Sequence, residues 1–349
     1  MTSVVPAEVG SNPAKVRLSW VDYTKGISLF LVVFGHVLLG LVHANLMEMS
    51  PLIELTWYSL YSFHVAVFFF ISGIFLGTRA HRPPREFLKS LFCTLAYPYV
   101  VWTILHSVIQ SLMSRYTNSP FDLRDLWKLI YMPTSQFWFL FALFWISLTY
   151  YVLFKLKLGV WPVLAAFIVL AIAIPGYYPS DWAPLVVICR HGWCVALGAA
   201  LYQIPGWSQI PVSLSSTYAA CLSLAGYLAI VLVSWIWPPD AEMGPFTLPI
   251  QTILGIVATI SLASLLANRH WLDSIRVWGE YSLEIYVAHI IVSAGIRIIL
   301  SKFLRFTDPT LHLVIGVIAA IYIPLLLAKV CYRIGFDNLY RLRTTSSPK

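Results

Sequence analysis

Apolar residues run along this chain in long, nearly unbroken stretches separated by short polar segments. Ten of these stretches are about 20 residues long, the length that crosses roughly 30 Å of hydrocarbon. They fall near residues 21–43, 56–78, 89–113, 136–154, 158–175, 183–202, 215–237, 247–267, 277–300 and 312–333. Inside a bilayer every backbone polar group needs an internal partner, so each stretch predicts a helix. The pattern therefore predicts an all-α fold, a polytopic membrane helix bundle of about ten transmembrane helices.

The composition agrees with a membrane protein. Of the 349 residues, 59% are hydrophobic and 11% charged, and the mean hydropathy is +0.77. This is too little polar surface to coat a soluble domain. The five cysteines lie in or beside apolar stretches without a CxxC pair, so we expect neither a disulfide framework nor a metal site.

The basic residues gather at the ends of the apolar stretches. Fourteen Lys and Arg residues fall in the terminal segments and in the loops on the same side, and five fall in the opposite loops. The positive-inside rule then places both termini in the cytoplasm of a multi-pass protein of the cell inner (plasma) membrane. Basic residues that anchor the helix ends at the lipid bilayer account for the net charge of +8, so no nucleic acid partner is expected.

The polar segments at the two ends set the expected domain limits. We expect a cytoplasmic N-terminal tail over 1–20, one integral membrane domain over 21–333 and a cytoplasmic C-terminal tail over 334–349. Residues 1–17 are polar and the first apolar run has no small-residue cleavage site, so no cleavable signal is predicted. The short C-terminal tail implies a membrane unit that acts alone or with another envelope-biosynthesis protein.

Lys25 and His36 are the most informative residues of the first predicted helix. They lie eleven residues apart, which is about three helical turns and about 16 Å, so both side chains face the same way. Ionisable groups are costly in hydrocarbon and usually have a functional reason to be there. One helix face is thus expected to carry a cation near the cytoplasm and an imidazole near the far side.

Other ionisable residues are predicted at the depth of His36. Counting the rise from each predicted helix end places His64, Arg190, His191 and His289 within about 5 Å of the same level. A shared layer predicts a common polar cavity in the outer half of the membrane. His106 and His191 are interpreted as packing or cavity-lining residues.

Four motifs occur in order along the chain, and together they resemble the acyltransferase-3 family of integral membrane acyltransferases, especially its fucose 4-O-acetylase-like branch. The motifs are Trp20 to Gly26 with Gly35-His36; Phe63-His64 to Ser72-Gly73; Phe137-Trp138-Phe139-Leu140; and Tyr281 to Tyr286 with His289. In the second motif a proline more often stands at or beside the position of Ala66.

The resemblance implies transfer of an acyl group, most often acetyl from cytoplasmic acetyl-CoA, to a hydroxyl of a cell-envelope sugar, glycolipid or polysaccharide precursor. His36 is then the expected general base, because a neutral imidazole with a reference pKa of about 6.5 takes a proton from an alcohol. Lys25 is expected to attract the CoA phosphates. No bound cofactor and no metal are expected, since acyl-CoA is a substrate.

Further site candidates come from the same motifs and the shared layer. Arg190, His64 or His289 is expected to stabilise the tetrahedral oxyanion or to orient the acceptor. The remaining candidates are Asp22, expected as a partner of Lys25 in acyl-CoA binding, and Glu284, Tyr286, Ser72 and Trp138.

Several of these residues also have a purely structural interpretation. Lys25 is alternatively a snorkelling anchor, and Asp22 a first-turn cap. His64 and His289 are alternatively hydrogen-bonded packing residues. Glu284 is interpreted either as the countercharge of His289 or as a helix-stabilising acceptor.

Two alternatives remain for the site as a whole. Arg190 would have a structural role if Asp181 or a carbonyl were its partner. A multi-pass transporter of a small polar or anionic envelope metabolite would also place polar residues at one depth, although related halves and paired broken helices are not visible in the sequence.

Overall fold

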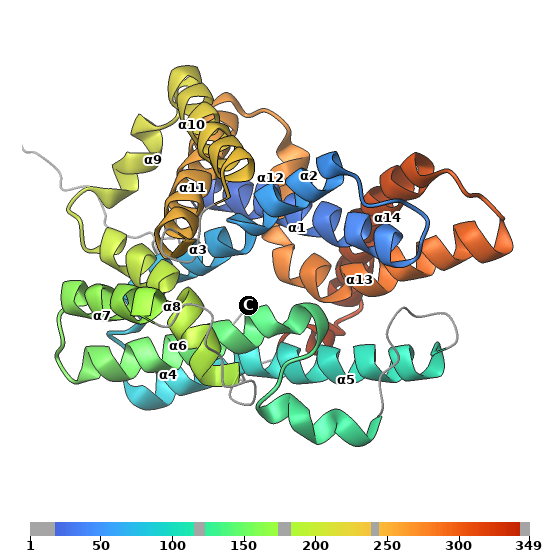
Figure 1. Cartoon of the computed structure of the whole chain (residues 1–349). Helices are drawn as coiled ribbons and strands as arrows, with labels where there is room; N and C mark the ends of the chain where they lie inside the picture. Colours follow the sequence, from blue (N-terminus) through green and yellow to red (C-terminus); the bar gives the residue numbers. More distant parts are fainter. Residues whose placement is uncertain (1–17, 115–122, 174–182, 239–243, 343–349) are drawn as a thin grey trace, which may run out of the picture.

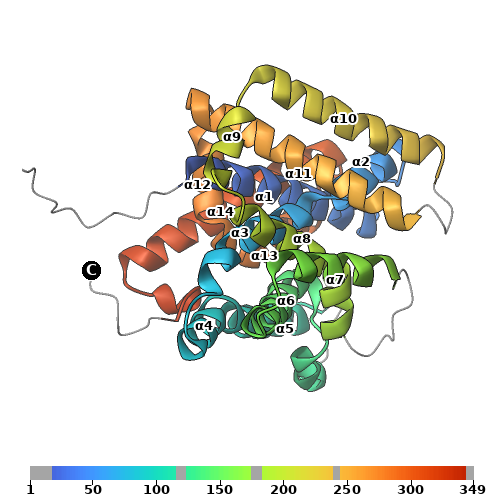
Figure 2. The ribbon, with the colours of Figure 1, turned by 90° about the vertical axis from the view of Figure 1, so that its left-hand side faces the viewer.

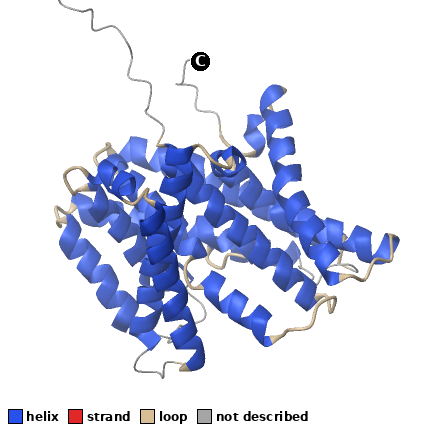
Figure 3. Cartoon of the chain, turned by 90° about the horizontal axis from the view of Figure 1, so that it is seen from above, coloured by secondary structure: helices blue, strands red, loops and turns tan. Residues whose placement is uncertain are grey.

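The computed structural model describes residues 18–114, 123–173, 183–238 and 244–342. Within these ranges all regular secondary structure is helical and no strand occurs (Figure 3). The predicted all-α class is confirmed. The N-terminal residues 1–17 of the expected tail, and Asp181, lie outside the described residues.

Fourteen α-helices and six short 3-10 or π segments make up the described chain. The α-helices are α1 Ser19–His43, α2 Pro51–Tyr61, α3 His64–Arg79, α4 Pro84–Leu91, α5 Tyr97–Leu112, α6 Trp138–Lys155, α7 Val160–Ala173, α8 Ala183–Tyr202, α9 Ile210–Ser213, α10 Thr217–Ile236, α11 Gly244–Arg269, α12 Asp273–Glu280, α13 Ser282–Ile298 and α14 Pro309–Arg333. The π segments are Phe92–Ala96 and Ile299–Phe303, and the 3-10 segments are Leu123–Ile130, Ser135–Phe137, Trp207–Gln209 and Asp337–Leu339.

Nine helical segments of the described residues are long and apolar enough to cross a membrane. The predicted fifth span, 158–175, corresponds to α7, which is described over only 14 residues and is shorter than the others. Lys25 near the start of α1 and Arg341 after α14 line the same cavity, so the described chain starts and ends on one side of the bundle. An even number of crossings would be needed for this arrangement, and the nine candidate segments of the described residues become ten only with the shorter α7.

Helix α1 runs through the middle of the bundle (Figure 1). It packs against α3, α11, α12, α13 and α14. Leu29 and Val33 of α1 are fully buried in a cluster with Ile285 of α13 and Ile321 of α14. By contrast, α10 lies along α11 at the edge of the molecule (Figure 2) and buries little of its surface. Because α1 is enclosed on several sides, its polar side chains project into the interior.

Glycines allow the closest helix contacts. A Cβ at Gly73 of α3 would lie 2.0 Å from the carbonyl oxygen of Val195, and one at Gly198 of α8 would lie 2.0 Å from that of Phe70. Small residues are the usual means by which membrane helices approach this closely, since lipid provides no hydrophobic drive for association. Of the Ser72-Gly73 pair in the second motif, the glycine therefore has a structural role, because it allows the close contact between helices.

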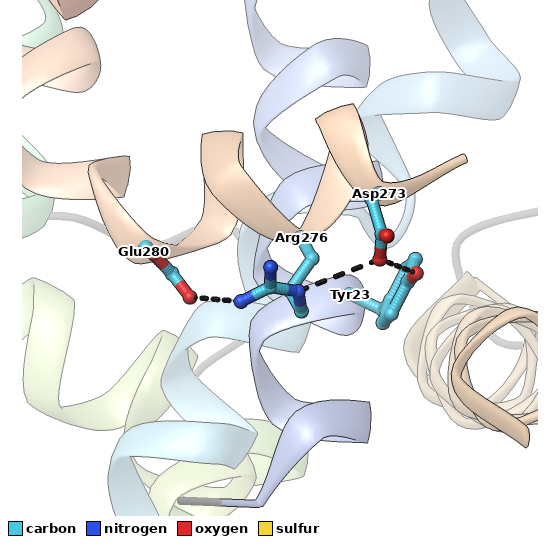
Figure 4. A network of polar contacts seen from close by, with 4 residues as sticks. All are labelled: Tyr23, Asp273, Arg276 and Glu280. Carbon is cyan, nitrogen blue, oxygen red and sulfur yellow. Dashed lines mark hydrogen bonds and ion pairs between the residues drawn. The ribbon is translucent and has the colours of Figure 1, made fainter. Parts of the chain in front are cut away.

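Helix α12 packs in very close contact with the first turns of α1. A Cβ at Gly279 would lie 1.7 Å from the carbonyl oxygen of Asp22, so only glycine fits there. Figure 4 shows the polar contacts beside this crossing. The Tyr23 hydroxyl donates to Asp273 at 2.9 Å, and Arg276 pairs with Asp273 at 3.6 Å and with Glu280 at 2.5 Å. These contacts hold α12 against the N-terminal turns of α1.

The segment after α14 is part of the packed bundle. Tyr340 is fully buried and stacks on Trp102 of α5 with ring centroids 5.4 Å apart. The Trp102 indole N–H donates to the carbonyl oxygen of Leu339 at 2.8 Å. Burial raises the pKa of the Tyr340 phenol. Residues 339 and 340 of the expected C-terminal tail thus pack against α5, while the domain limits themselves stay a prediction.

Candidate active site

Two cavities open between the described helices, one toward each end of α1. The first, here called the inner cavity, has a volume of about 420 Å³ and lies at the end where α1 begins. Its walls come from α1, α3, α4, the π segment Phe92–Ala96, α6, α12, α13 and the segment after α14. The second, the outer cavity, has a volume of about 530 Å³ and lies between α1, α5, α13 and α14.

Basic side chains dominate the polar wall of the inner cavity. The cations are Lys25, Arg79, Arg82 and Arg341, and the carboxylates are Glu280 and Glu284. Each carboxylate already holds an ion pair, Glu280 with Arg276 and Glu284 with Arg341. The positive-inside rule explains why basic residues gather at this end. The fold brings four of them to one cavity, which gives it a positive electrostatic potential.

Glu284 anchors the last of these cations. Its carboxylate is fully buried and accepts hydrogen bonds from the Tyr332 hydroxyl and from Nη2 of Arg341, the latter at 2.9 Å. Burial disfavours the charged guanidinium, but attraction to Glu284 outweighs this and raises the pKa of Arg341. Of the two interpretations of Glu284, the acceptor is the one that these contacts support, since the carboxylate lines the inner cavity and pairs with Arg341 rather than with His289.

Histidine dominates the polar wall of the outer cavity. His36, His43, His106 and His312 line it together with Arg297. Lys25 and His36 thus lie in the walls of two different cavities, about 16 Å apart along one helix. The predicted arrangement of one cation and one imidazole on α1 agrees with this geometry.

Only a few rings separate the two cavities near His36. Tyr286 and Phe139 line the inner cavity with ring centroids 5.7 Å apart. The Tyr286 ring is 6.0 Å from that of His289, which is in turn 5.2 Å from the ring of His36 in the outer cavity. The Tyr286 hydroxyl donates to the carbonyl oxygen of Gln136, which holds the phenol between the two spaces.

Hydrogen bonds fix the tautomer of two histidines. In His289, which is fully buried, Nδ1 is 2.6 Å from the carbonyl oxygen of Tyr286. A carbonyl only accepts, so Nδ1 carries the proton and Nε2 of the neutral ring is an acceptor. This Nε2 has no hydrogen-bond partner among the described residues. The same reasoning applies to His64, whose Nδ1 donates to the carbonyl oxygen of Leu60.

Three of the five residues of the predicted polar layer lie near one another, but only His36 lines the outer cavity, so a cavity common to all five is not what the structure has. His36 and His289 are adjacent, and His64 joins them through Tyr61, whose ring is 4.8 Å from His64 and 6.5 Å from His36. Arg190 is exposed and lines neither cavity. Depth along a helix does not fix the direction in which a side chain points, and α8 directs Arg190 away from the histidines.

Of the other candidate residues, some line the inner cavity and others are packed between helices. Ser72 and Tyr286 line the inner cavity. Asp22 is 4% exposed and lines neither cavity, and its carbonyl oxygen lies under α12. Trp138 packs on His191 with ring centroids 5.2 Å apart. His191 also stacks on Phe69, at 5.0 Å, so its packing role is the one that the geometry supports.

Sequence reasoning missed several residues of both cavities. Arg79, Arg82 and Arg341 served only to orient the chain, and no role was assigned to Arg297. A signal for Arg297 was present, because an arginine inside a predicted span calls for a partner. No such signal marked the others, since positive charges at this side of a membrane protein are expected anyway.

Comparison with known families identifies the class of protein. The family model described as an acyltransferase domain matches residues 18–329, nearly the whole described chain. The chain belongs to this acyltransferase-3 family, and it is a multi-pass membrane acyltransferase. Comparisons with curated proteins and with solved structures gave no match. The family resemblance predicted from the motifs is confirmed, while the narrower branch stays a prediction.

Proposed function

We propose that this protein is an O-acyltransferase of the cell inner membrane, which moves an acetyl group from cytoplasmic acetyl-CoA to a hydroxyl of a cell-envelope sugar or polysaccharide precursor. The observation that carries the proposal is the approach of two cavities, from opposite ends of α1, to the adjacent rings of His36 and His289. A donor and an acceptor on opposite sides of a membrane need such an arrangement.

The inner cavity suits the donor. CoA carries several phosphate charges, and Arg and Lys side chains bind phosphate through short, charge-assisted hydrogen bonds. Lys25, Arg79 and Arg82 are the groups that we assign to the phosphates. The pantetheine arm is long enough to follow α1 from Lys25 toward His36, a rise of about 16 Å. The thioester carbon would then arrive beside the Tyr286 and Phe139 rings.

His36 is the proposed general base. Its neutral imidazole takes the proton of the acceptor hydroxyl while the oxygen attacks the thioester carbonyl. The tetrahedral intermediate then collapses, the C–S bond breaks and CoA leaves as a thiolate. The imidazolium returns its proton to that thiolate, so the ester and CoA are formed and His36 is neutral again.

His289 is proposed as the residue that positions His36. Its proton is held on Nδ1 by the carbonyl oxygen of Tyr286, and its Nε2, which has no partner among the described residues, is the acceptor that we assign to an N–H of the adjacent His36 ring when the acceptor substrate binds. The second nitrogen of His36 then presents its lone pair to the hydroxyl. An acceptor nitrogen is unsuited to stabilise an oxyanion, so we assign His289 and His64 no oxyanion role.

Tyr286 is proposed to separate donor from acceptor until both are bound. Its ring lies between the inner cavity and His289, and its hydroxyl is tied to Gln136. The acyl arm must displace this ring to reach His36. With the ring in place, water in the outer cavity is kept from the thioester.

The proposal is tested with cells that carry or lack the gene. Mass spectrometry of envelope polysaccharides and lipid-linked sugars is expected to show O-acetyl groups that depend on the gene. Restoring the gene with His36→Ala should not restore them, whereas Arg190→Ala, at a residue that lines neither cavity, should. Identical O-acetylation with and without the gene, together with purified protein that does not bind acetyl-CoA, would refute the proposal.

A further inference from the structure

The wall of the outer cavity is mostly apolar. Beside its histidines and Arg297, the cavity has three polar lining residues, Gln110, Ser135 and Ser293. Its other side chains are aliphatic or methionine, among them Leu41, Ile109, Met113, Ile290 and Ile298. Among the described lining residues there is no carboxylate and no Phe, Tyr or Trp. A free polysaccharide would give up its hydrogen bonds to water without enough replacements in such a wall, which is costly. The lining favours a ligand with a substantial apolar part.

Arg297 is the one guanidinium among the described lining residues of this cavity. Its Nη1 donates to the carbonyl oxygen of Gly40 at 2.6 Å, and no carboxylate of the described chain pairs with it. A partly buried guanidinium presents further N–H donors and a full charge, so it favours an anion such as phosphate. Gly40 lies one turn beyond His36, so the cation is anchored about 6 Å from His36 along α1.

A second polar group in the cavity wall also lacks a partner. His106 of α5 is 8% exposed, lines the outer cavity, and its Nδ1 has no hydrogen-bond partner among the described residues. Buried polar atoms in native proteins are normally satisfied. This buried nitrogen therefore needs a partner that the described residues do not supply.

Two glycines give the cavity its room. Gly40 of α1 and Gly295 of α13 both line it, and a Cβ added at either would meet nothing within 4 Å. Unlike Gly73 and Gly279, these glycines are not needed for helix contact. They leave space beside Arg297 that a larger side chain would fill.

We infer that the outer cavity binds the acceptor as an anionic amphiphile. Its phosphate-type group pairs with Arg297, its tail lies against the isoleucine wall, and its reacting hydroxyl stands at His36, within about 6 Å of the anion. A lipid-linked sugar phosphate that is acylated on the sugar next to the phosphate has this chemistry. The inference rests on the proposed function, and it adds the class of acceptor and the place of the reacting hydroxyl.

Competition with simple probes tests the chemistry of the cavity. Membranes that contain the protein are supplied with labelled acetyl-CoA, and transfer to the endogenous acceptor is measured with decyl phosphate, decanol, decyltrimethylammonium or inorganic phosphate present. Decyl phosphate is expected to inhibit at a concentration about tenfold lower than the others, a difference of about 1.4 kcal/mol. Equal inhibition by all amphiphiles, or by inorganic phosphate, would overturn the inference. So would displacement of acetyl-CoA by decyl phosphate, which would place that probe in the inner cavity.

Matched variants of Arg297 test the residue assigned to the anion. Arg297→Gln keeps a donor for Gly40 and removes the charge, whereas Arg297→Lys keeps the charge. The glutamine variant is expected to need about tenfold more decyl phosphate for the same inhibition, and the lysine variant to stay within about threefold of the parent. An unchanged inhibition in Arg297→Gln would contradict the inference.

A cavity-filling variant tests the space itself. Gly295→Leu is expected to abolish transfer while acetyl-CoA binding is kept, because the added side chain enters the outer cavity. Gly226→Leu on α10 is the matched control, since a Cβ there also meets nothing within 4 Å and the residue lines neither cavity. Full transfer by Gly295→Leu would refute the assignment of this space to the acceptor.

The chemical nature of the labelled product distinguishes a failure of the inferred acceptor class from a failure of the proposed function. Labelled product that is extracted by organic solvent and retained by an anion exchanger supports the inference. Labelled product that is neutral or soluble in water, formed by an active enzyme, overturns the inference and leaves the proposed function standing. Absence of both transfer and acetyl-CoA binding in the unmodified protein overturns the proposed function.

Discussion

The two cavities differ in the chemistry of their walls, although one helix serves both. The inner cavity gathers Lys25, Arg79, Arg82 and Arg341, and the outer cavity has histidines and a single arginine in a largely aliphatic wall. A ligand with many negative charges fits the first, and one with a single charge and an apolar tail fits the second. One helix can therefore line two cavities of different polar chemistry, with lysine and arginine in one and mainly histidine in the other.

The largest expected effect comes from His36, which lines the outer cavity and whose ring lies next to that of His289. His36→Ala should lower the rate of acyl transfer by about 10²- to 10⁴-fold, the usual contribution of a general base. Acetyl-CoA binding should be unchanged, because the inner cavity does not contain this residue. Single-turnover transfer and equilibrium binding measure the two quantities. His270→Ala, at an exposed residue, serves as the control, and a fully active His36→Ala variant would exclude this base.

A smaller effect, a loss of stability, is expected when Arg341 in the wall of the inner cavity is replaced. Arg341→Ala leaves the buried carboxylate of Glu284 with Tyr332 alone. Removing one partner of a buried pair costs several kcal/mol, but the Arg341 side chain is 61% exposed, so we expect about 2 kcal/mol. Thermal unfolding in detergent measures the loss.

The double variant is the check on this pair. Arg341→Ala combined with Glu284→Gln removes the uncompensated charge and should recover part of the lost stability. If the double variant is as unstable as the sum of the two single variants, the pair does not act as the structure indicates.

A more modest effect is expected for donor binding. Arg82→Ala should raise the KM for acetyl-CoA about tenfold, because one charge-assisted contact to phosphate is lost. The maximal rate should change little, which distinguishes this residue from His36. Arg85→Ala is the matched control, since Arg85 lies three residues on and lines neither cavity. Equal KM values for the two variants would remove Arg82 from the phosphate site.

The smallest effect is expected for Arg190. It is exposed and lines neither cavity, so Arg190→Ala should leave transfer and acetyl-CoA binding within about twofold of the parent, a change of roughly 0.4 kcal/mol. A loss of tenfold or more would show that this part of α8 belongs to the site after all.

The comparison of sequence with structure is clearest at single helices. The 3.6-residue repeat was enough to place Lys25 and His36 on one face, because both lie on the same rigid helix. It was not enough for Arg190, because its position relative to His36 depends on how α8 is rotated and packed. The glycines at α3 and α8 decide that packing, and their partners were not visible in the sequence.

The C-terminal segment is a second place where the sequence did not predict the tertiary contacts. Its polar residues predicted a tail, and nothing local marks Tyr340 as a core residue. The pocket that buries Tyr340 is formed by Trp102 and Tyr332, which are distant in the sequence. Arg341 reaches the inner cavity only because this segment is held there.

The class of fold, the gathering of basic residues at helix ends and the motifs of the acyltransferase family can all be recognised in the sequence alone. The fold class can be recognised because a bilayer imposes a length and an apolar composition on every spanning helix. Which side chains meet depends on the helix packing: it brings the His36 and His289 rings next to each other, forms the basic wall of the inner cavity, and places Arg297 in the outer cavity. The sequence predicts how deep a residue lies along its helix. The neighbours of its side chain depend in addition on the rotation and packing of all the helices around it.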